Sequence, residues 1–249
     1  MFPGAAGYDR AITMFSPDGR LYQVEYAIET VRRGTLAIGV KGKDGVVLAV
    51  EEKSRKLQFS DVTQKIFQVD DHIGVAAAGY ISDARTQVDH ARFFAQSNRL
   101  IYDEPVDVEG VAKNSADMAQ QYTQYAGVRP FAVALIWAGV DKNGSSLFLT
   151  DPSGTYIGYN AIAIGAGSDQ VNEFLEKNYR ADIDTEEAAI LAIETIYLVS
   201  EDKTGIRHIK MAMIDFQTKT MRNVEEVDIE KYSIKSKENA SKRTDSAQQ

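Results

Sequence analysis

The chain has 249 residues, 44% of them hydrophobic, which is enough to bury a substantial core in one large domain or two small ones. Its formal net charge of −8 argues against nucleic acid as a partner, because phosphate binding relies on Lys and Arg clusters, and the absence of cysteine excludes disulfides, thiol catalysis and cysteine-ligated zinc. With no apolar run near about eighteen residues and no signal-peptide core, we expect a soluble cytoplasmic protein without a membrane partner.

The N-terminal region predicts a polar arm followed by a turn. The arm contains Tyr8, Asp9 and Arg10 and buries little apolar surface, so it gains little against its ordering entropy and is either disordered or held by a partner. Ser16-Pro17-Asp18-Gly19 predicts a turn, because proline fixes φ, aspartate can cap through its side chain and glycine accepts unusual backbone angles.

An amphipathic helix is expected from about Arg20 to Arg33, and Gly34 ends it. Acidic residues lie near its start and arginines at its end, as the helix dipole favours. On this pattern alone the helix could simply pack on its own domain. Its apolar stripe has spacings of three and four: Leu21, Val24, Ile28 and Val31.

Strands then predominate. Two strands at 35–40 and 46–50 flank the Lys43-Asp44-Gly45 turn and predict a hairpin, and a second pair is expected at 65–69 and 73–78. Helices follow at about 82–98 and 107–125.

The second half repeats this order. Strands are expected at 131–139, at 147–150, after Gly154 and at 161–165, followed by two helices. The second helix begins near Asp184 with a candidate capping box to Glu187. A strand at 209–216 and a short amphipathic element at 224–232 come last.

This order of elements indicates an α+β fold, because runs of strands alternate with pairs of helices. Two antiparallel sheets with a helix pair on each outer face would form a four-layer αββα sandwich. We therefore predict an N-terminal arm and helix at 1–34, one αββα domain at 35–232 and a disordered polar tail at 233–249, where apolar residues become rare.

The sequence from Tyr8 to Ala27 resembles the N-terminus of proteasome alpha subunits nearly continuously, and the resemblance covers about residues 7–230. It implies the N-terminal-nucleophile hydrolase fold and a non-catalytic alpha subunit of an archaeal-type 20S proteasome core. The partners it implies are identical or paralogous alpha subunits in a seven-membered ring, proteolytic beta subunits, an AAA+ ATPase activator that docks through its C-terminus, and unfolded protein substrates in transit.

The catalytic subunits of proteasomes resemble this chain in their core and suggest an alternative, enzymatic function. Matched with them, Thr35 occupies the nucleophile position, Glu51 the acid and Lys65 the lysine. However, the mechanism needs a free α-amine on the threonine, and here a 34-residue segment precedes it. The supporting serines of those relatives are also missing, since Ala166 occupies one position and the stretch 203–207 lacks the other. We therefore expect no catalytic residue, with a self-processed threonine hydrolase using Thr35 as the alternative.

The resemblance also assigns the functional residues. The gate residues would be Tyr8, Asp9, Arg10, Pro17 and Tyr26. The activator pocket would include Lys65 and Gly79, although the residues alone suggest that Lys65 opens a strand and faces solvent. A loop forming the pore constriction would contain Tyr125, Gly127, Val128 and Arg129.

Three residues depart from the family pattern: Ile28, Tyr80 and Ala126. Other candidate chemistry is weak. Gly165-x-Gly167 could hold a phosphate but is more often a tight turn. The three histidines are scattered, so we expect neither a metal nor a cofactor. The acidic pairs 51–52 and 70–71 are expected to be solvated.

Overall fold

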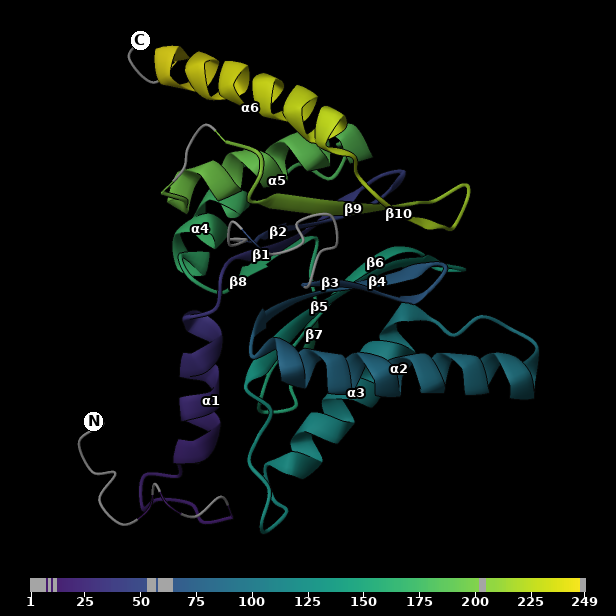
Figure 1. Cartoon of the computed structure of the whole chain (residues 1–249), viewed down its shortest axis with the longest axis vertical. Coiled ribbons are helices and arrows are strands. Elements are labelled where there is room, and N and C mark those ends of the chain that lie inside the picture. Colours follow the sequence, from purple (N-terminus) through teal and green to yellow (C-terminus); the bar gives the residue numbers. More distant parts are fainter. Residues whose placement is uncertain are drawn as a thin grey trace.

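The computed structural model describes residues 8, 10, 13–52, 57, 65–201 and 205–246. Two five-stranded sheets lie face to face in the middle of the molecule (Figure 1). The first has the order β10-β9-β2-β1-β8 and consists of β1 (Ala37–Gly42), β2 (Gly45–Glu51), β8 (Ala161–Ile164), β9 (Ile209–Asp215) and β10 (Met221–Asn223). The second has the order β3-β4-β5-β6-β7 and consists of β3 (Ile66–Asp70), β4 (Ile73–Gly79), β5 (Val133–Asp141), β6 (Gly144–Thr150) and β7 (Tyr156–Gly158). All strand pairs are antiparallel.

Helices cover both outer faces of the sandwich (Figure 1). The first sheet carries α4 (Ser168–Asn178), α5 (Thr185–Val199) and α6 (Glu226–Ser246), and the second carries α2 (Ile81–Tyr102) and α3 (Val108–Tyr122). Three apolar clusters fill the spaces between the four layers: one between the sheets, one under α4 to α6, and one under α2 and α3. The predicted αββα sandwich is confirmed.

Helix α1 (Tyr22–Arg32) extends from one end of the sandwich and contacts β4 and β5 (Figure 1). Its buried face is formed by Tyr22, Val24, Ala27 and Val31. The predicted stripe is thus only half right, because Leu21 becomes the N-cap and Ile28 is half-exposed. Strand β10 was not predicted, because its three residues show no period and no Gly or Pro marks the turn before it, unlike the equally short β7 after Gly154.

The capping box that opens α5 is confirmed. Asp184 Oδ1 accepts a hydrogen bond from the Glu187 amide at 2.8 Å, and Glu187 Oε2 accepts one from the Asp184 amide at 3.1 Å. Residues 188–196 of this helix are all buried, as the nearly continuous apolar sequence predicts. Helix α5 is therefore the inner member of its layer.

The prediction of a disordered tail from residue 233 is wrong for the residues that the structure describes. Helix α6 continues to Ser246 and lies over α5 (Figure 1). Polar contacts anchor it, because Arg243 Nη1 donates to Glu194 Oε1 at 2.6 Å and Lys235 pairs with Glu186. A low apolar content did not mean disorder in this segment, because ion pairs to α5 supply the contacts. The remaining domain divisions stay predictions.

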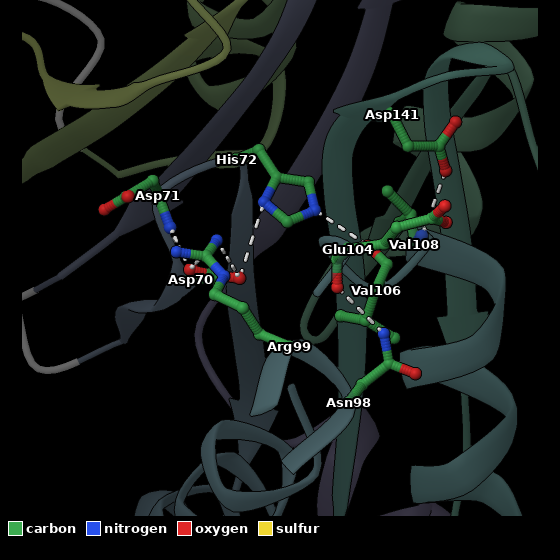
Figure 2. A network of polar contacts seen from close by, with 9 residues as sticks. All are labelled: Asp70, Asp71, His72, Asn98, Arg99, Glu104, Val106, Val108 and Asp141. Carbon is green, nitrogen blue, oxygen red and sulfur yellow. Dashed lines mark hydrogen bonds and ion pairs between the residues drawn. The ribbon is translucent and has the colours of Figure 1, made fainter. Parts of the chain in front are cut away.

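A polar network joins one end of the second sheet to the connection between α2 and α3 (Figure 2). His72 Nε2 donates to Val106 O at 2.8 Å, and its Nδ1 faces Asp70 Oδ2 at 3.6 Å. Arg99 Nη2 lies 3.0–3.1 Å from both carboxylate oxygens of Asp70. Asp70 is therefore paired, which corrects the expectation of a solvated side chain for Asp70, while Asp71 is exposed as expected. None of the described residues forms a group of three or more His, Asp or Glu that could hold a metal ion.

Candidate functional site

The turn before α1 is closed by hydrogen bonds from its own residues. The Ser16 amide donates to Arg20 O at 3.0 Å, the Gly19 amide donates to Ser16 O at 2.9 Å, and Ser16 Oγ accepts from the Arg20 amide at 3.1 Å. Gly19 has a φ of +75°, a conformation that favours glycine. Arg20 also donates to Glu25 from Nε at 2.7 Å, which ties the turn to the first turn of the helix.

The predicted gate residues lie on these elements. Tyr8 and Arg10 belong to the arm, Pro17 is exposed at the turn, and Tyr26 is half-buried on α1, where its ring lies 6.4 Å from that of Tyr22. Asp9 lies outside the described residues. The gate cluster therefore stays a prediction.

A buried polar cluster lies directly after α1. Lys65 is only 5% exposed, and its Nζ, which has three N–H donors when charged, lies within hydrogen-bond distance of four oxygens. Two belong to Thr35, the hydroxyl and the carbonyl, both at 2.7 Å, and the others are Leu36 O at 3.0 Å and Glu51 O at 3.1 Å. Burial lowers the pKa of Lys65 to about 7, although the carboxylates of Glu52 and Glu51 act in the opposite direction. The simple expectation that Lys65 faces solvent is wrong.

Glu51, at the position of the catalytic acid, has a different side-chain partner. Glu51 is buried and accepts a hydrogen bond through Oε1 from Ser200 Oγ at 2.9 Å, while its backbone carbonyl accepts one from Lys65 Nζ. Ser200 Oγ also lies 3.4 Å from His208 Nε2. The expectation that Glu51 is solvated is therefore wrong. Sequence reasoning missed Ser200, and no local signal marks it, because 149 residues separate it from Glu51.

The chemistry of the cluster differs from that of a working N-terminal nucleophile. The lysine and the threonine hydroxyl are in contact, but the threonine nitrogen is an amide that follows α1 and Gly34 along a continuous chain. An amide nitrogen has no basicity and cannot act as the general base. The pair is thus positioned without the group that would activate it.

The glycine loop before α4 forms the expected tight turn. Gly165 and Gly167 have φ values of +98° and +77°, and the Ala166 amide donates to Gly34 O at 2.7 Å. An added Cβ at Gly165 would lie 2.7 Å from Thr35 O, so the loop packs closely on the chain after α1. The stretch 203–207 was expected to lack the second supporting serine, and its residues 203 and 204 lie outside the described residues.

Gly79, predicted in the activator pocket, lies at a tight backbone junction. Its φ is +114°, and an added Cβ would lie 2.3 Å from Ala132 O. Gly34 packs against it, since a Cβ there would lie 2.4 Å from Gly79 N. The end of α1, the end of β4 and the start of β5 therefore meet at this point. The structure brings Gly79 close to the segment that Lys65 contacts, but a docking pocket stays a prediction.

The loop predicted to form the constriction connects α3 to β5. Tyr125 is 61% exposed, Gly127 has a φ of +85°, and Val128 is also exposed. Arg129 turns back from this loop to the carboxylate of Asp83 at the start of α2, with Nη1–Oδ2 and Nη2–Oδ1 distances of 2.6 and 2.8 Å. Sequence reasoning missed Asp83. The loop and the segment before α1 both lie at the end of the molecule opposite α6 (Figure 1).

The fold and this cluster together define an αββα sandwich of the N-terminal-nucleophile hydrolase class in which the nucleophile position lies inside the chain. The family model for proteasome subunits matches residues 31–214, and the model for the N-terminal signature of A-type proteasome subunits matches residues 8–29. The chain belongs to the proteasome subunit family. As a member it is one component of a protease complex and assembles with other proteasome subunits.

The relatives carry the alpha designation. The chain is 48% identical over 227 residues to the proteasome alpha subunit of Methanosarcina barkeri, and this match covers 91% of each chain. Identity to the alpha subunit of Methanothermobacter thermautotrophicus is 49% over 226 residues, with 90% and 91% coverage. Identity to that of Saccharolobus solfataricus is 52% over 195 residues, with 78% and 81% coverage. No helix among the described residues is long and apolar enough to cross a membrane.

Proposed function

We propose that this chain is a non-catalytic alpha subunit of a cytoplasmic 20S proteasome core, whose proteolytic beta subunits are threonine-type endopeptidases. Seven copies, identical or paralogous, form an outer ring that gates the entry of unfolded protein. The observation that carries the proposal is the alpha-type signature at residues 8–29, followed by an intact helix that leads directly into Thr35. This connection leaves the threonine without the free amine that catalysis needs.

In this proposal the arm closes the axial pore and weak contacts set its state. The residues involved are Tyr8, Asp9, Arg10, Pro17 and Tyr26. A gate needs two states of similar free energy, and exposed polar contacts, each contributing about 0–1 kcal/mol, suit such a balance. The turn at Ser16 gives the arm a fixed point of departure.

An AAA+ ATPase activator would dock its C-terminus beside Lys65 and Gly79. Lys65 donates to Thr35, Leu36 and Glu51 oxygens in the single chain, so an arriving carboxylate has to exchange with these acceptors. A C-terminal carboxylate is chemically suited to this exchange, because a charged acceptor forms a stronger hydrogen bond with an ammonium than a neutral carbonyl does.

Native mass spectrometry tests the assembly. We expect the full-length chain to form a seven-membered ring that is inert on peptides until beta subunits join. A monomer that has lost its first 34 residues and cleaves peptides unaided would overturn the proposal and make Thr35 a nucleophile.

Deleting residues 2–12 tests the gate. The assembled particle without the arm should hydrolyse short peptides faster than the full-length particle, because the pore entrance is then open. Substituting the exposed Glu173→Gln on α4 gives a control that alters a remote ion pair with Lys177. Equal rates for full-length and arm-deleted particles would refute the gate assignment.

A further inference from the structure

We propose that Asp83 is the positioning residue of the pore loop: its carboxylate holds Arg129 and thereby limits the free length of the loop at the constriction. This inference rests on the proposed function, since it takes the loop between α3 and β5 to line the pore. What it adds is a residue outside that loop, on α2, which sets how far the loop can move.

The clamp formed by Asp83 and Arg129 has the geometry of a strong ion pair. Arg129 uses Nη1 and Nη2 to contact the two carboxylate oxygens of Asp83 at 2.6 and 2.8 Å, which is the bidentate arrangement. Asp83 is 7% exposed, whereas the Arg129 side chain is 58% exposed and covers the carboxylate from the solvent side. Burial alone would raise the pKa of Asp83, but hydrogen bonds from Arg129 and the Ala132 amide outweigh it and lower the pKa.

The same carboxylate also fixes the far side of the loop. Asp83 Oδ2 accepts a hydrogen bond from the Ala132 amide at 2.9 Å, and Ala132 O accepts one from the Tyr80 amide at 2.8 Å. The guanidinium of Arg129 lies over the Tyr80 ring, 5.7 Å from its centroid. One acidic side chain therefore joins the start of α2, the loop and the start of β5.

A second contact closes the base of the loop. The rings of Tyr122 and Phe131 lie 4.3 Å apart between centroids, at the end of α3 and just before β5. Between this ring pair and the clamp, the exposed tip holds Tyr125, Gly127 and Val128. Releasing the clamp frees Arg129 and the adjoining residues, so the tip gains length and mobility. A longer mobile tip cannot hold a narrow opening of fixed width.

The experiment uses the complete particle with beta subunits and arm-deleted alpha subunits, so that the gate does not limit entry. Two probes are compared. The first is a linear reporter peptide that carries a fluorophore and a quencher. The second, called the doubled chain, is the same peptide cyclised by a disulfide, so that two strands must pass the constriction side by side. We expect Asp83→Asn and Asp83→Ala to raise the rate for the doubled chain relative to the linear one several-fold. The charge swap that combines Asp83→Arg with Arg129→Asp should restore the ratio only in part, because an arginine at position 83 cannot accept the hydrogen bond from the Ala132 amide.

Controls separate this inference from the proposed function. Tyr125→Ala at the loop tip should also change the ratio if the loop lines the pore, and Glu173→Gln on α4 should not. An effect of Tyr125→Ala without any effect of the Asp83 variants overturns the positioning role and leaves the pore assignment standing. No effect from either contradicts the pore assignment itself. A variant of Asp83 that lowers thermal stability at an unchanged ratio shows a purely structural residue and overturns the inference.

Discussion

At the scale of single residues, Lys65 is the side chain whose environment differs most from its sequence expectation. A buried ammonium among four oxygens has a pKa of about 7, far below that of a lysine in an unfolded chain. Between about pH 7 and pH 10 the unfolded state binds a proton that the folded state lacks, so stability rises with pH in this window. Below pH 7 both states are charged and the full penalty for burying the ammonium applies.

Lys65→Met should remove this pH dependence. The free energy of unfolding of the unsubstituted chain, measured by urea titration, should rise relative to that of the variant by a few kcal/mol, at most about 5, from pH 7 to pH 10. The variant also removes the lysine donor from buried Thr35 and Glu51 oxygens, which lowers its stability at every pH, whereas Leu36 O keeps its hydrogen bond from the Glu51 amide. Lys142→Met, at an exposed position, corrects for the loss of one lysine. Parallel pH curves for the unsubstituted chain and Lys65→Met would show that the lysine is not desolvated.

At the scale of elements, the capping box of α5 gives a local prediction. Asp184→Ala removes the acceptor for the Glu187 amide and should lower the free energy of unfolding by about 1 kcal/mol. Asp184→Asn keeps an acceptor and should be close to neutral. Thermal unfolding followed by circular dichroism compares the two variants. If alanine and asparagine have the same effect, the Asp184 side chain does not contribute, and the helix start is held by Glu187 on the Asp184 amide and by Asp44 on Thr185.

The elements that sequence predicts well are those specified by neighbouring residues. The hairpin at Lys43-Asp44-Gly45 and the box at Asp184 use contacts within a few residues, and both are confirmed. The inward position of Lys65 and the clamp between Asp83 and Arg129 depend on partners 30 and 46 residues away. No periodicity carries that information, so the site could be located by resemblance but its contacts could not be predicted.

At the scale of the whole molecule, α6 shows how a polar segment becomes part of the fold. Its first half buries Ile229 and Tyr232 on α5, which the expected amphipathic element anticipates. Beyond Tyr232 the helix is held by Lys235 and Arg243, which pair with carboxylates of α5. The carboxylate of Glu194 is largely buried, and burial raises its pKa although Arg243 acts in the opposite direction.

Ending the chain after Tyr232 should therefore destabilise the monomer, whereas removal of a disordered tail would be neutral. The truncation removes the buried Ser233 and Ser236 together with the lysine and arginine that pair with α5. The cost of roughly 3–5 kcal/mol for losing one partner of a buried ion pair is an upper bound that applies only where α6 still covers Glu194, because truncation exposes this carboxylate to water. We expect a lower urea midpoint for the truncated chain. Arg243→Gln in the full-length chain isolates the ion pair from the rest of the helix, and Arg32→Gln on α1 is a matched change in an exposed pair with Glu29. A truncated chain as stable as the full-length one would mean that α6 beyond Tyr232 adds nothing to the fold, and that the sequence-based boundary was right in energetic terms.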